Sequence, residues 1–258
     1  MKHDVPTEAT REARPADAPP RTLASSVYER LRHDILTGAL APDSKLRIEF
    51  LGARYDTGTS PMREALNRLL ADGLVRREEQ RGFFVAPVSP GELVEFTKTR
   101  CWLEDVALRE SIAHGGDDWE ERVLIAVHRL QRVPRSLKPG TYESNPEWER
   151  RHVLFHQALL SACGSRPLVA FCDQLQQLTY RYRQLAAAKS YPRHDEQGEH
   201  EAVVKAALAR DAATATRLLA DHYRHTTEVI LSQRGILGPD AKAPKKPRRR
   251  PEVQRATS

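Results

Sequence analysis

Residues 59–85 read TSPMREALNRLLADGLVRREEQRGFFV, and this stretch decides the fold of the N-terminal part of the chain. The Ser-Pro pair at residues 60–61 is typical of a helix start, and the apolar residues after it recur at helical spacing. Gly73 stands where a glycine ends a helix. The segments LVRREE and FFVA, on either side of the basic turn QRG within residues 74–86, predict a β-hairpin.

Two further helical segments precede this stretch. The first begins near Leu23 and places Val27, Leu31 and Ile35 at four-residue spacing, which is one face of a helix. The second covers residues 48–55. The order helix, helix, turn, helix, hairpin is that of a winged helix-turn-helix. The predicted fold class is therefore mainly α, beginning with a winged helix-turn-helix of three helices and a β-hairpin.

The residue types in this unit favour DNA binding. In a helix-turn-helix, the first turn of the second helix enters the major groove, and an arginine there can form a bidentate pair with guanine. The alternative interpretation is that these charges are solvated on an unrelated small domain. The candidate DNA-binding residues are Thr59, Ser60, Arg63 and Asn67 on the helix, Arg81 and Gly82 at the tip of the hairpin, and Arg32, Lys45 and Arg47 as contacts to the DNA backbone.

The remaining chain divides by composition. Residues 1–20 are polar and proline-rich, and we expect a disordered arm. Residues 21–88 form the winged helix, and the segment APVSPG at 86–91 is a linker. Residues 92–234 have helical periodicity throughout and predict an all-helical bundle of about six helices. Residues 235–258 include KAPKKPRRRP, which predicts a basic, disordered tail.

Four histidines in the helical part have the spacing of a metal site. His152 and His156 are four residues apart, so both imidazoles lie on one face of a helix. His200 and His222 fall in two other predicted helices. Four imidazoles suit a borderline divalent cation, with zinc or nickel the expected metal. The alternative is that His152 lies on the helix surface and that no metal binds.

The bulk composition permits a nucleic-acid partner and argues against a membrane. The net charge is +6 and the isoelectric point is about 9.3. We find no apolar run of the roughly 18–20 residues that span a bilayer, and no apolar core of a signal peptide. Cys101, Cys163 and Cys172 are widely spaced and do not resemble a disulfide framework, so a reducing cytoplasm is expected.

The motifs resemble those of the GntR family of bacterial transcription regulators. In the N-terminal unit, the matching segments are VYERLRHDILTGALAP, PMREAL and DGLVRREEQRGFFV, at residues 27–42, 61–66 and 72–85. The second unit resembles the helical FCD effector domain of the FadR subgroup, in residues 100–104 (RCWLE), in Phe155 with His156, and in residues 200–222. The resemblance covers about residues 21–232.

The resemblance implies a two-domain homodimer that binds a palindromic operator, and a small carboxylate effector in the FCD domain. It also implies a metal held by an Asp, a His four residues later and two further histidines. The last three positions fall on His156, His200 and His222, whereas His152 stands at the Asp position and departs from the pattern. Arg100 stands where relatives place an arginine toward the effector carboxylate; the alternative is an ion pair with Glu104.

We therefore expect a cytoplasmic, homodimeric DNA-binding repressor that is not an enzyme. Two other functions remain open. One is a metal-dependent hydrolase or lyase on the helical domain, because Glu199 and Glu201 flank His200, although the chain has no HExxH motif. The other is a direct metal sensor whose only input is the histidine site.

Overall fold

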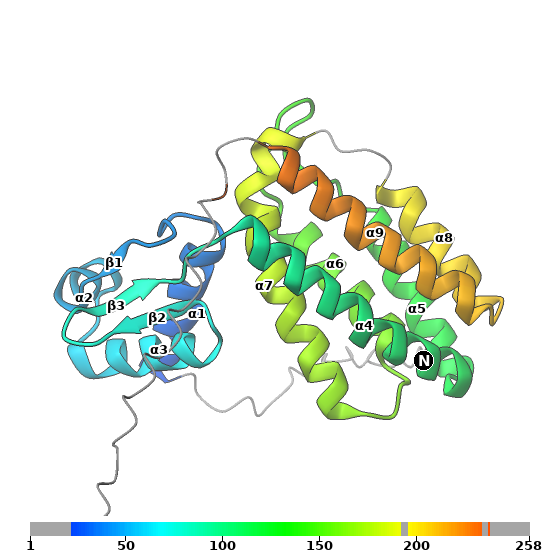
Figure 1. Ribbon diagram of the computed structural model, residues 1–258, viewed down its shortest axis with the longest axis horizontal. Helices are drawn as coiled ribbons and strands as arrows, with labels where there is room; N and C mark the ends of the chain where they lie inside the picture. The colour runs from blue at the N-terminus through cyan, green and yellow to red at the C-terminus, as the bar shows by residue number, and fades with distance from the viewer. Residues whose placement is uncertain (1–21, 192–195, 234–236, 238–258) are drawn as a thin grey trace, which may run out of the picture.

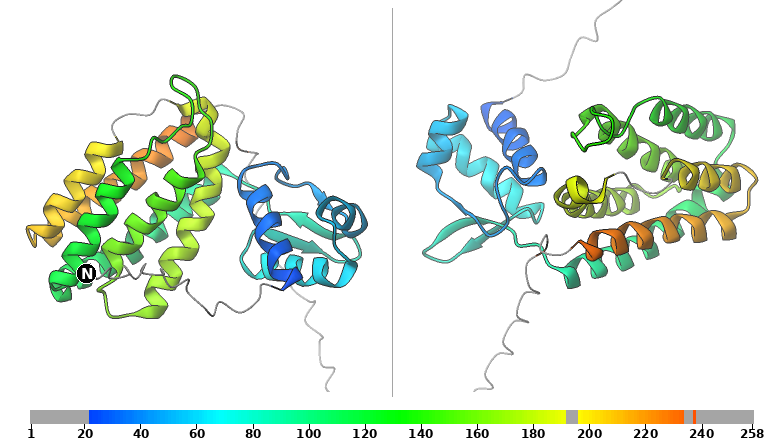
Figure 2. Two further views of the ribbon diagram at one scale, coloured as in Figure 1. Left: turned by 180° about the vertical axis from the view of Figure 1, so that it is seen from behind. Right: turned by 90° about the horizontal axis from the view of Figure 1, so that it is seen from above.

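The structure of the protein is a computed structural model that describes residues 22–191, 196–233 and 237. The arm predicted at residues 1–20 lies outside the described residues, as does the tail predicted at 235–258 apart from Leu237. The described chain forms two units, which lie side by side in Figures 1 and 2. The N-terminal unit is the smaller one, and its helices and strands are α1 (Leu23–Leu36), β1 (Lys45–Leu46), α2 (Ile48–Tyr55), α3 (Thr59–Ala71), β2 (Val75–Glu78) and β3 (Gly82–Val85).

The N-terminal unit confirms the predicted winged helix-turn-helix and adds one strand to it. β3 pairs antiparallel with both β2 and β1, which gives a three-stranded sheet in the order β1-β3-β2. The sequence predicted only the hairpin, so the short strand β1 was missed. The third helix begins at Thr59 with Gly58 as its N-cap, two residues before the predicted start at Pro61 with Ser60 as the N-cap. Gly82 has a φ of +92° at the start of β3, a conformation that favours glycine.

Apolar side chains at helical spacing hold this unit together. α1 contributes Val27, Leu31 and Ile35, and α3 contributes Met62 and Leu66, all almost fully buried. They pack against one another and against the inner face of the sheet. This core fixes α3 with its first turn at the surface, where a major groove can reach it.

The second unit is a bundle made only of helices in the described residues. Each of four helices has a polar side chain at its N-cap, namely Ser89, Asn145, Ser165 and Asp211. The first helix begins at Pro90, inside the segment expected to be linker. The six helices are α4 (Pro90–His114), α5 (Asp117–Gln131), α6 (Pro146–Leu160), α7 (Arg166–Ser190), α8 (Glu196–Leu208) and α9 (Ala212–Ser232).

The core of the bundle is formed by large side chains from several helices. Trp119 on α5 is almost fully buried, and its indole N–H donates to the carbonyls of Ala158 and Leu159 at the end of α6. Phe155 lies in the same cluster, beside the imidazoles of His156 and His200. The apolar core therefore continues directly into the polar interior described below.

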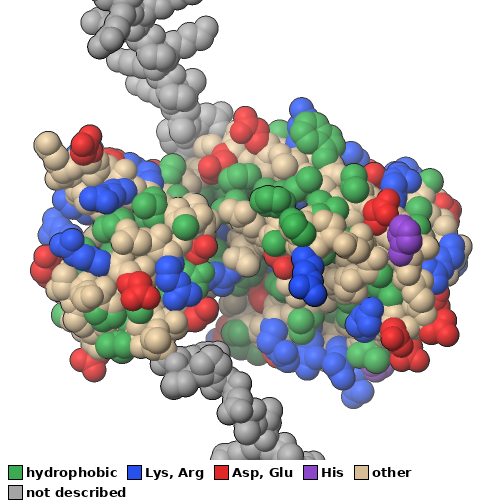
Figure 3. All heavy atoms as spheres, turned by 90° about the horizontal axis from the view of Figure 1, so that it is seen from below, with side chains coloured by type: hydrophobic (Ala, Val, Ile, Leu, Met, Phe, Trp, Pro, Cys, Tyr) green, Lys and Arg blue, Asp and Glu red, His purple; other side chains and the backbone are tan. Residues whose placement is uncertain are grey.

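The helix α7 forms the boundary between the two units (Figures 1 and 2). It packs against α4 and α9 in the bundle and against α1 in the winged helix. Its side chains Leu178 and Tyr180 pack against the core of the N-terminal unit. Figure 3 shows the two units meeting along a narrow recess. None of the described helices is both long enough and apolar enough to cross a membrane.

Candidate metal centre and nucleic-acid interface

A basic groove lies on the winged helix between the start of α2, the first turns of α3 and the hairpin. Its volume is about 500 Å³. We call it the basic groove, and the charged side chains that line it are Lys45, Arg47, Arg63, Arg77, Arg81, Glu49 and Glu78. Five arginine and lysine side chains against two glutamates give this surface a positive charge that attracts phosphate. No side-chain hydrogen bond caps the N-terminus of α3, and an uncapped helix start can bind an anion such as a phosphate.

The groove collects five of the nine residues that the sequence nominated for DNA binding, namely Lys45, Arg47, Arg63, Arg81 and Gly82. Thr59, Ser60 and Asn67 are exposed on α3 beside it. Arg32 is placed elsewhere, in a recess of about 400 Å³ between α1 and the helices α6 and α7. The structure does not bring Arg32 together with the other eight residues.

Arg77 lines the groove and was missed by sequence reasoning. It lies on β2, opposite Phe83 of β3, and its guanidinium carbon lies 5.8 Å from the centre of that ring. The available signal was its position just before the basic turn, in the same hairpin as Arg81. The Arg81 side chain is 70% exposed and forms an ion pair with Glu78, which leaves the other N–H groups of its guanidinium at the surface.

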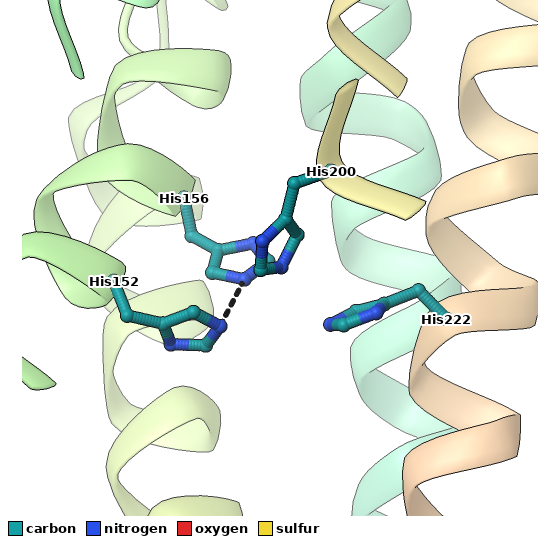
Figure 4. A group of neighbouring side chains, drawn as sticks. All are labelled: His152, His156, His200 and His222. Atoms are coloured by element: carbon teal, nitrogen blue, oxygen red, sulfur yellow. Dashed lines mark hydrogen bonds between the residues drawn. The ribbon is translucent and has the colours of Figure 1, made fainter. Parts of the chain in front are cut away.

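The second site is the histidine cluster, which consists of His152, His156, His200 and His222. They come from three helices, α6, α8 and α9, and all four side chains point toward one another (Figure 4). All four residues are buried, and one ligating nitrogen of each lies within 4.8 Å of the others. The Nε2 atoms of His152 and His156 are 3.2 Å apart. The sequence prediction that these residues meet is therefore correct in space.

Groups outside the cluster orient two of these imidazoles for metal binding. The Tyr223 hydroxyl donates to the Glu104 carboxylate, so at 2.9 Å it accepts a hydrogen bond from His156 Nδ1–H. Burial raises the pKa of Tyr223 well above its usual value, which keeps this hydroxyl protonated. The Glu199 carboxylate accepts from His222 Nδ1–H at 2.6 Å. Both imidazoles then present an unprotonated Nε2 to the cluster, as metal-bound histidines do when their other ring N–H donates to a neighbouring acceptor.

His152 has a different partner. Arg183 Nη1 donates to His152 Nδ1 over 3.3 Å, and a guanidinium has no acceptor. In this arrangement His152 Nε2 carries the proton and donates to His156 Nε2. Arg183 thus opposes metal binding by His152, the position at which the chain departs from the metal-binding pattern that the family resemblance implies.

Burial and nearby positive charges keep two of the four histidines, His152 and His156, neutral near pH 7. Burial, followed by the charge of Arg183, lowers the pKa of His152 well below its usual value. Burial, followed by the charge of Arg100, does the same for the pKa of His156. Only neutral imidazole binds a metal, and four buried imidazole donors within reach of one another fit a borderline divalent cation.

A small cavity of about 40 Å³ adjoins the cluster, and we call it the histidine cavity. His152 and His222 form part of its wall, together with Arg100, Gln176 and Arg183. The other residues of the wall come from α4, α7 and α9, namely Leu93, Thr97, Thr179, Tyr180, Tyr223, Thr226, Thr227 and Ile230.

Arg100 forms the ion pair with Glu104 that was the alternative interpretation, and it also faces the cavity. Its Nε donates to Glu104 at 2.6 Å, its Nη1 to Thr179 at 3.3 Å, and its guanidinium lies 3.8 Å from the centre of the Tyr223 ring. Its Nη2 is buried and has no hydrogen-bond partner among the described residues. The side-chain nitrogen of Gln176 is likewise buried and has no hydrogen-bond partner among the described residues. Two buried donors without acceptors fit an acceptor-rich ligand such as a carboxylate.

Gln176 and Tyr223 belong to this site, but sequence reasoning did not assign them to it, whereas Arg183 and Arg181 were weaker sequence candidates for contact with the effector. Arg183 forms an ion pair of 2.5 Å with Glu149, one helical turn before His152. Tyr223 directly follows His222, and this neighbourhood was the only signal available for it. Nothing in the local sequence distinguishes Gln176 from the glutamines around it.

Comparisons with known proteins assign each of the two units to a family. Residues 23–85 match the bacterial regulatory proteins of the gntR family, and residues 95–225 match the FCD domain. The HTH-type transcriptional regulator BphR of Paraburkholderia xenovorans is 39% identical over 86% of this chain and 93% of its own. The HTH-type transcriptional repressor GlaR of Escherichia coli is 34% identical over 82% of this chain and 96% of its own. The structure of E. coli McbR/YncC shares the fold, with a TM-score of 0.65 at 20% identity, over 82% of this chain and 98% of that one.

These matches cover both units, and they are regulators rather than enzymes. They do not support a hydrolase or lyase on the helical domain. The winged helix with its basic groove is thus the DNA-binding unit, and the bundle with its histidine cavity is the effector unit. The chain belongs to the GntR family of bacterial transcription regulators, with an FCD effector domain behind its DNA-binding domain.

Proposed function

We propose that the protein is a homodimeric repressor of the FadR subgroup, which binds a palindromic operator and responds to a small organic acid. The acid occupies the histidine cavity, beside a divalent metal, zinc or nickel, held by the histidine cluster. A location in the cytoplasm stays a prediction from the cysteine pattern. Repression is supported by the relative GlaR, which is a transcriptional repressor.

The basic groove supplies the DNA contacts in this proposal. Arg63 reads a base edge, because it lies in the first turns of α3 and is exposed. Thr59, Ser60 and Asn67 contact phosphate or neighbouring base edges. Lys45, Arg47 and Arg81 contact the DNA backbone, and Arg77 joins them as a contact that the structure suggests.

The histidine cluster holds the metal. His156, His200 and His222 are the main ligands, and His152 is the weakest, because Arg183 donates to its Nδ1. When bound, the metal supplies a positive charge next to the cavity, which favours an anionic ligand. Glu199 and Tyr223 hold the imidazoles of His222 and His156 in the orientation that this role requires.

One observation carries the assignment of an acid as the ligand. Arg100 Nη2 and Gln176 Nε2 are buried in one small cavity without acceptors among the described residues. Leaving such donors unsatisfied costs about 1–3 kcal/mol each, so a carboxylate that accepts from both recovers that free energy. The acid changes operator affinity only as far as it binds one arrangement of the dimer better than the other.

A panel of carboxylic acids tests this assignment. We expect at least one acid to raise the melting temperature of the metal-loaded protein and to change its affinity for an operator selected from random DNA. Replacing Arg100→Met together with Glu104→Gln keeps the charge balance of the buried pair. This double variant should lose at least about tenfold in acid affinity, because a charge-assisted hydrogen bond contributes about 1.5–3 kcal/mol.

The control for this test is a second arginine–carboxylate pair on the same helix. Arg109 and Asp105 form an exposed ion pair of 2.9 Å, four residues apart like Arg100 and Glu104. The variant Arg109→Met with Asp105→Asn should bind the acid like the wild type. Equal acid affinity in both double variants would contradict a role for Arg100 in the cavity.

The homodimer has a candidate contact surface on α4. Val94, Trp102 and Val106 are spaced along that helix, and they are 47%, 61% and 50% exposed. Figure 3 shows apolar side chains among the charges on one face of the bundle. We expect Trp102→Glu to convert the dimer to a monomer in sedimentation velocity at low micromolar concentration, because buried tryptophans at interfaces contribute about 2 kcal/mol or more.

Leu124→Glu is the matched control, since Leu124 is 48% exposed on α5 rather than on α4. It should sediment like the wild type. A Trp102→Glu protein that keeps the wild-type mass would place the dimer contact elsewhere.

A direct metal sensor is the second candidate function, and the four buried imidazoles favour it. A measurement of operator affinity with and without the metal distinguishes the two functions. A sensor changes its operator affinity when the metal alone is added or removed, whereas the proposed repressor also requires the acid.

A further inference from the structure

The helix α7 has two functional faces. Gln176, Thr179, Tyr180 and Arg183 line the histidine cavity and follow the i, i+3, i+4, i+7 pattern. The residues two positions later in the same pattern are Leu178, Arg181, Tyr182 and Leu185. Two residues correspond to about 200° around a helix, so the second set lies nearly opposite the first.

The second face contacts the winged helix, together with Tyr180, which lines the cavity and also packs against the core of that unit. Leu178 packs against the core of that unit and lies beside Gly73, at the end of α3. Leu185 lies beside Gly38, which follows α1. α7 therefore contacts two turns of the DNA-binding unit directly.

Arg181 contacts the linker between the two units. It is 3% exposed, and its Nη2 donates to the carbonyl of Ala86 at 2.6 Å and its Nη1 to that of Pro87 at 3.4 Å. The N–H of Ala86 in turn donates to the carbonyl of Leu74, which directly precedes β2. Ala86 thus joins the hairpin of the winged helix to the guanidinium on α7.

Tyr182 holds the other end of the linker. Its hydroxyl accepts from the N–H of Ser89 at 3.3 Å and donates to the carboxylate of Glu92. Ser89 is the N-cap of α4, so this contact fixes the start of the bundle. The linker from Ala86 to Ser89, which joins the winged helix to the bundle, is therefore held at both ends by side chains of α7.

We propose that Arg181 is a positioning residue, which fixes the orientation of the winged helix on the bundle and thereby sets the operator spacing that the dimer accepts. The inference rests on the proposed binding of a palindrome by a dimer. The two winged helices of a dimer can bind two half-sites at once only if each winged helix is held in one orientation to the dimer axis. Because the opposite face of α7 lines the cavity, a ligand there acts on the same rigid helix that holds the linker.

Three variants test this role. Arg181→Met removes both hydrogen bonds to the linker, whereas Arg181→Lys keeps the charge and one donor group. Arg166→Met is the matched control, because Arg166 is exposed at the start of the same helix. Operators are selected from random duplexes with a variable spacer, and affinities are then measured for the best spacer and for spacers one base pair longer or shorter.

We expect wild type and Arg166→Met to discriminate against the altered spacers by about tenfold or more, as mismatched sites do in specific complexes. Arg181→Met should discriminate by less than about threefold, and Arg181→Lys should lie between them. General loss of stability would weaken all spacers alike, so it would not produce this pattern. An unchanged spacer preference in Arg181→Met overturns the inference.

A second measurement needs no operator. Spin labels at Ala71→Cys on α3 and Arg129→Cys on α5, both exposed positions, report the distance between the units in a Cys101→Ser background. Arg181→Met should broaden this distance distribution, and an unchanged distribution also overturns the inference. If the wild type selects no palindrome, the proposed function fails, and the spin-label result decides the role of Arg181 by itself. Should Arg181→Met fail to fold, Arg181→Lys carries both measurements.

Discussion

Replacing His156 and His200 together by alanine should abolish metal binding. We expect wild-type protein incubated with zinc or nickel and then desalted to hold close to one metal per chain by elemental analysis. The double variant should hold almost none, because it loses two of the three main ligands of the proposed site and leaves only His222 and the weaker ligand His152. This is the largest effect that the structure predicts.

The loss of metal should also lower the stability of the folded protein. A ligand that binds only the folded state stabilises it by about 4 kcal/mol when its concentration is 1,000 times the dissociation constant. The melting temperature of the wild type should therefore fall on treatment with a chelator, and that of the double variant should not respond. Four buried imidazoles from three helices make the folded state the one that binds.

Two exposed histidines provide the control. His114 and His128 lie at the surface of α4 and α5, and the variant His114→Ala with His128→Ala should keep its metal. Single variants refine the result, since His152→Ala should retain more metal than His156→Ala if Arg183 opposes coordination by His152. Wild-type protein that holds no metal after incubation would rule out the metal site and leave the cluster as polar lining of the cavity.

Replacing Arg63 by alanine should reduce specific operator binding. A bidentate arginine–guanine pair contributes about 1–3 kcal/mol, which corresponds to roughly 5- to 150-fold in affinity. We expect the loss to concentrate at one base pair of each half-site, where the variant should accept other bases. Fluorescence anisotropy with the selected operator, its single-base variants and random duplex measures both effects.

Lys45→Ala and Arg129→Ala separate base reading from phosphate attraction. Lys45 lines the basic groove, and if it contacts the DNA backbone as proposed, its loss should weaken binding of selected and random DNA alike. It should also reduce the slope of log affinity against log salt by about one. Arg129 is exposed on α5, in the other unit, and its loss should change neither. An Arg63→Ala protein that loses equal affinity for selected and random DNA would reassign Arg63 to a phosphate contact.

The sequence determined most of the secondary structure and the family. Helix boundaries follow from caps and from apolar residues at short spacing, and these signals act over one or two turns. The winged helix, the all-helical second unit and the meeting of four histidines were therefore all predicted correctly. The metal, the acid and the dimer remain predictions, because they concern ligands and partners rather than the chain's own packing.

The tertiary structure decided which groups surround those residues. Strand β1 has only two residues, and it exists because β3 pairs with it from almost 40 positions away. Tyr223 reaches His156 across 67 residues, and Arg183 reaches His152 across 31. Arg32 looked like Lys45 and Arg47 in the sequence, yet packing directs it toward the recess between the units. Arg181 likewise could not be singled out from the sequence, because it resembles the other arginines of its helix. Only the fold brings the carbonyls of the linker within reach of its guanidinium. Local signals fix where helices begin and end, whereas contacts between distant segments depend on how whole helices pack, and only the folded chain contains that information.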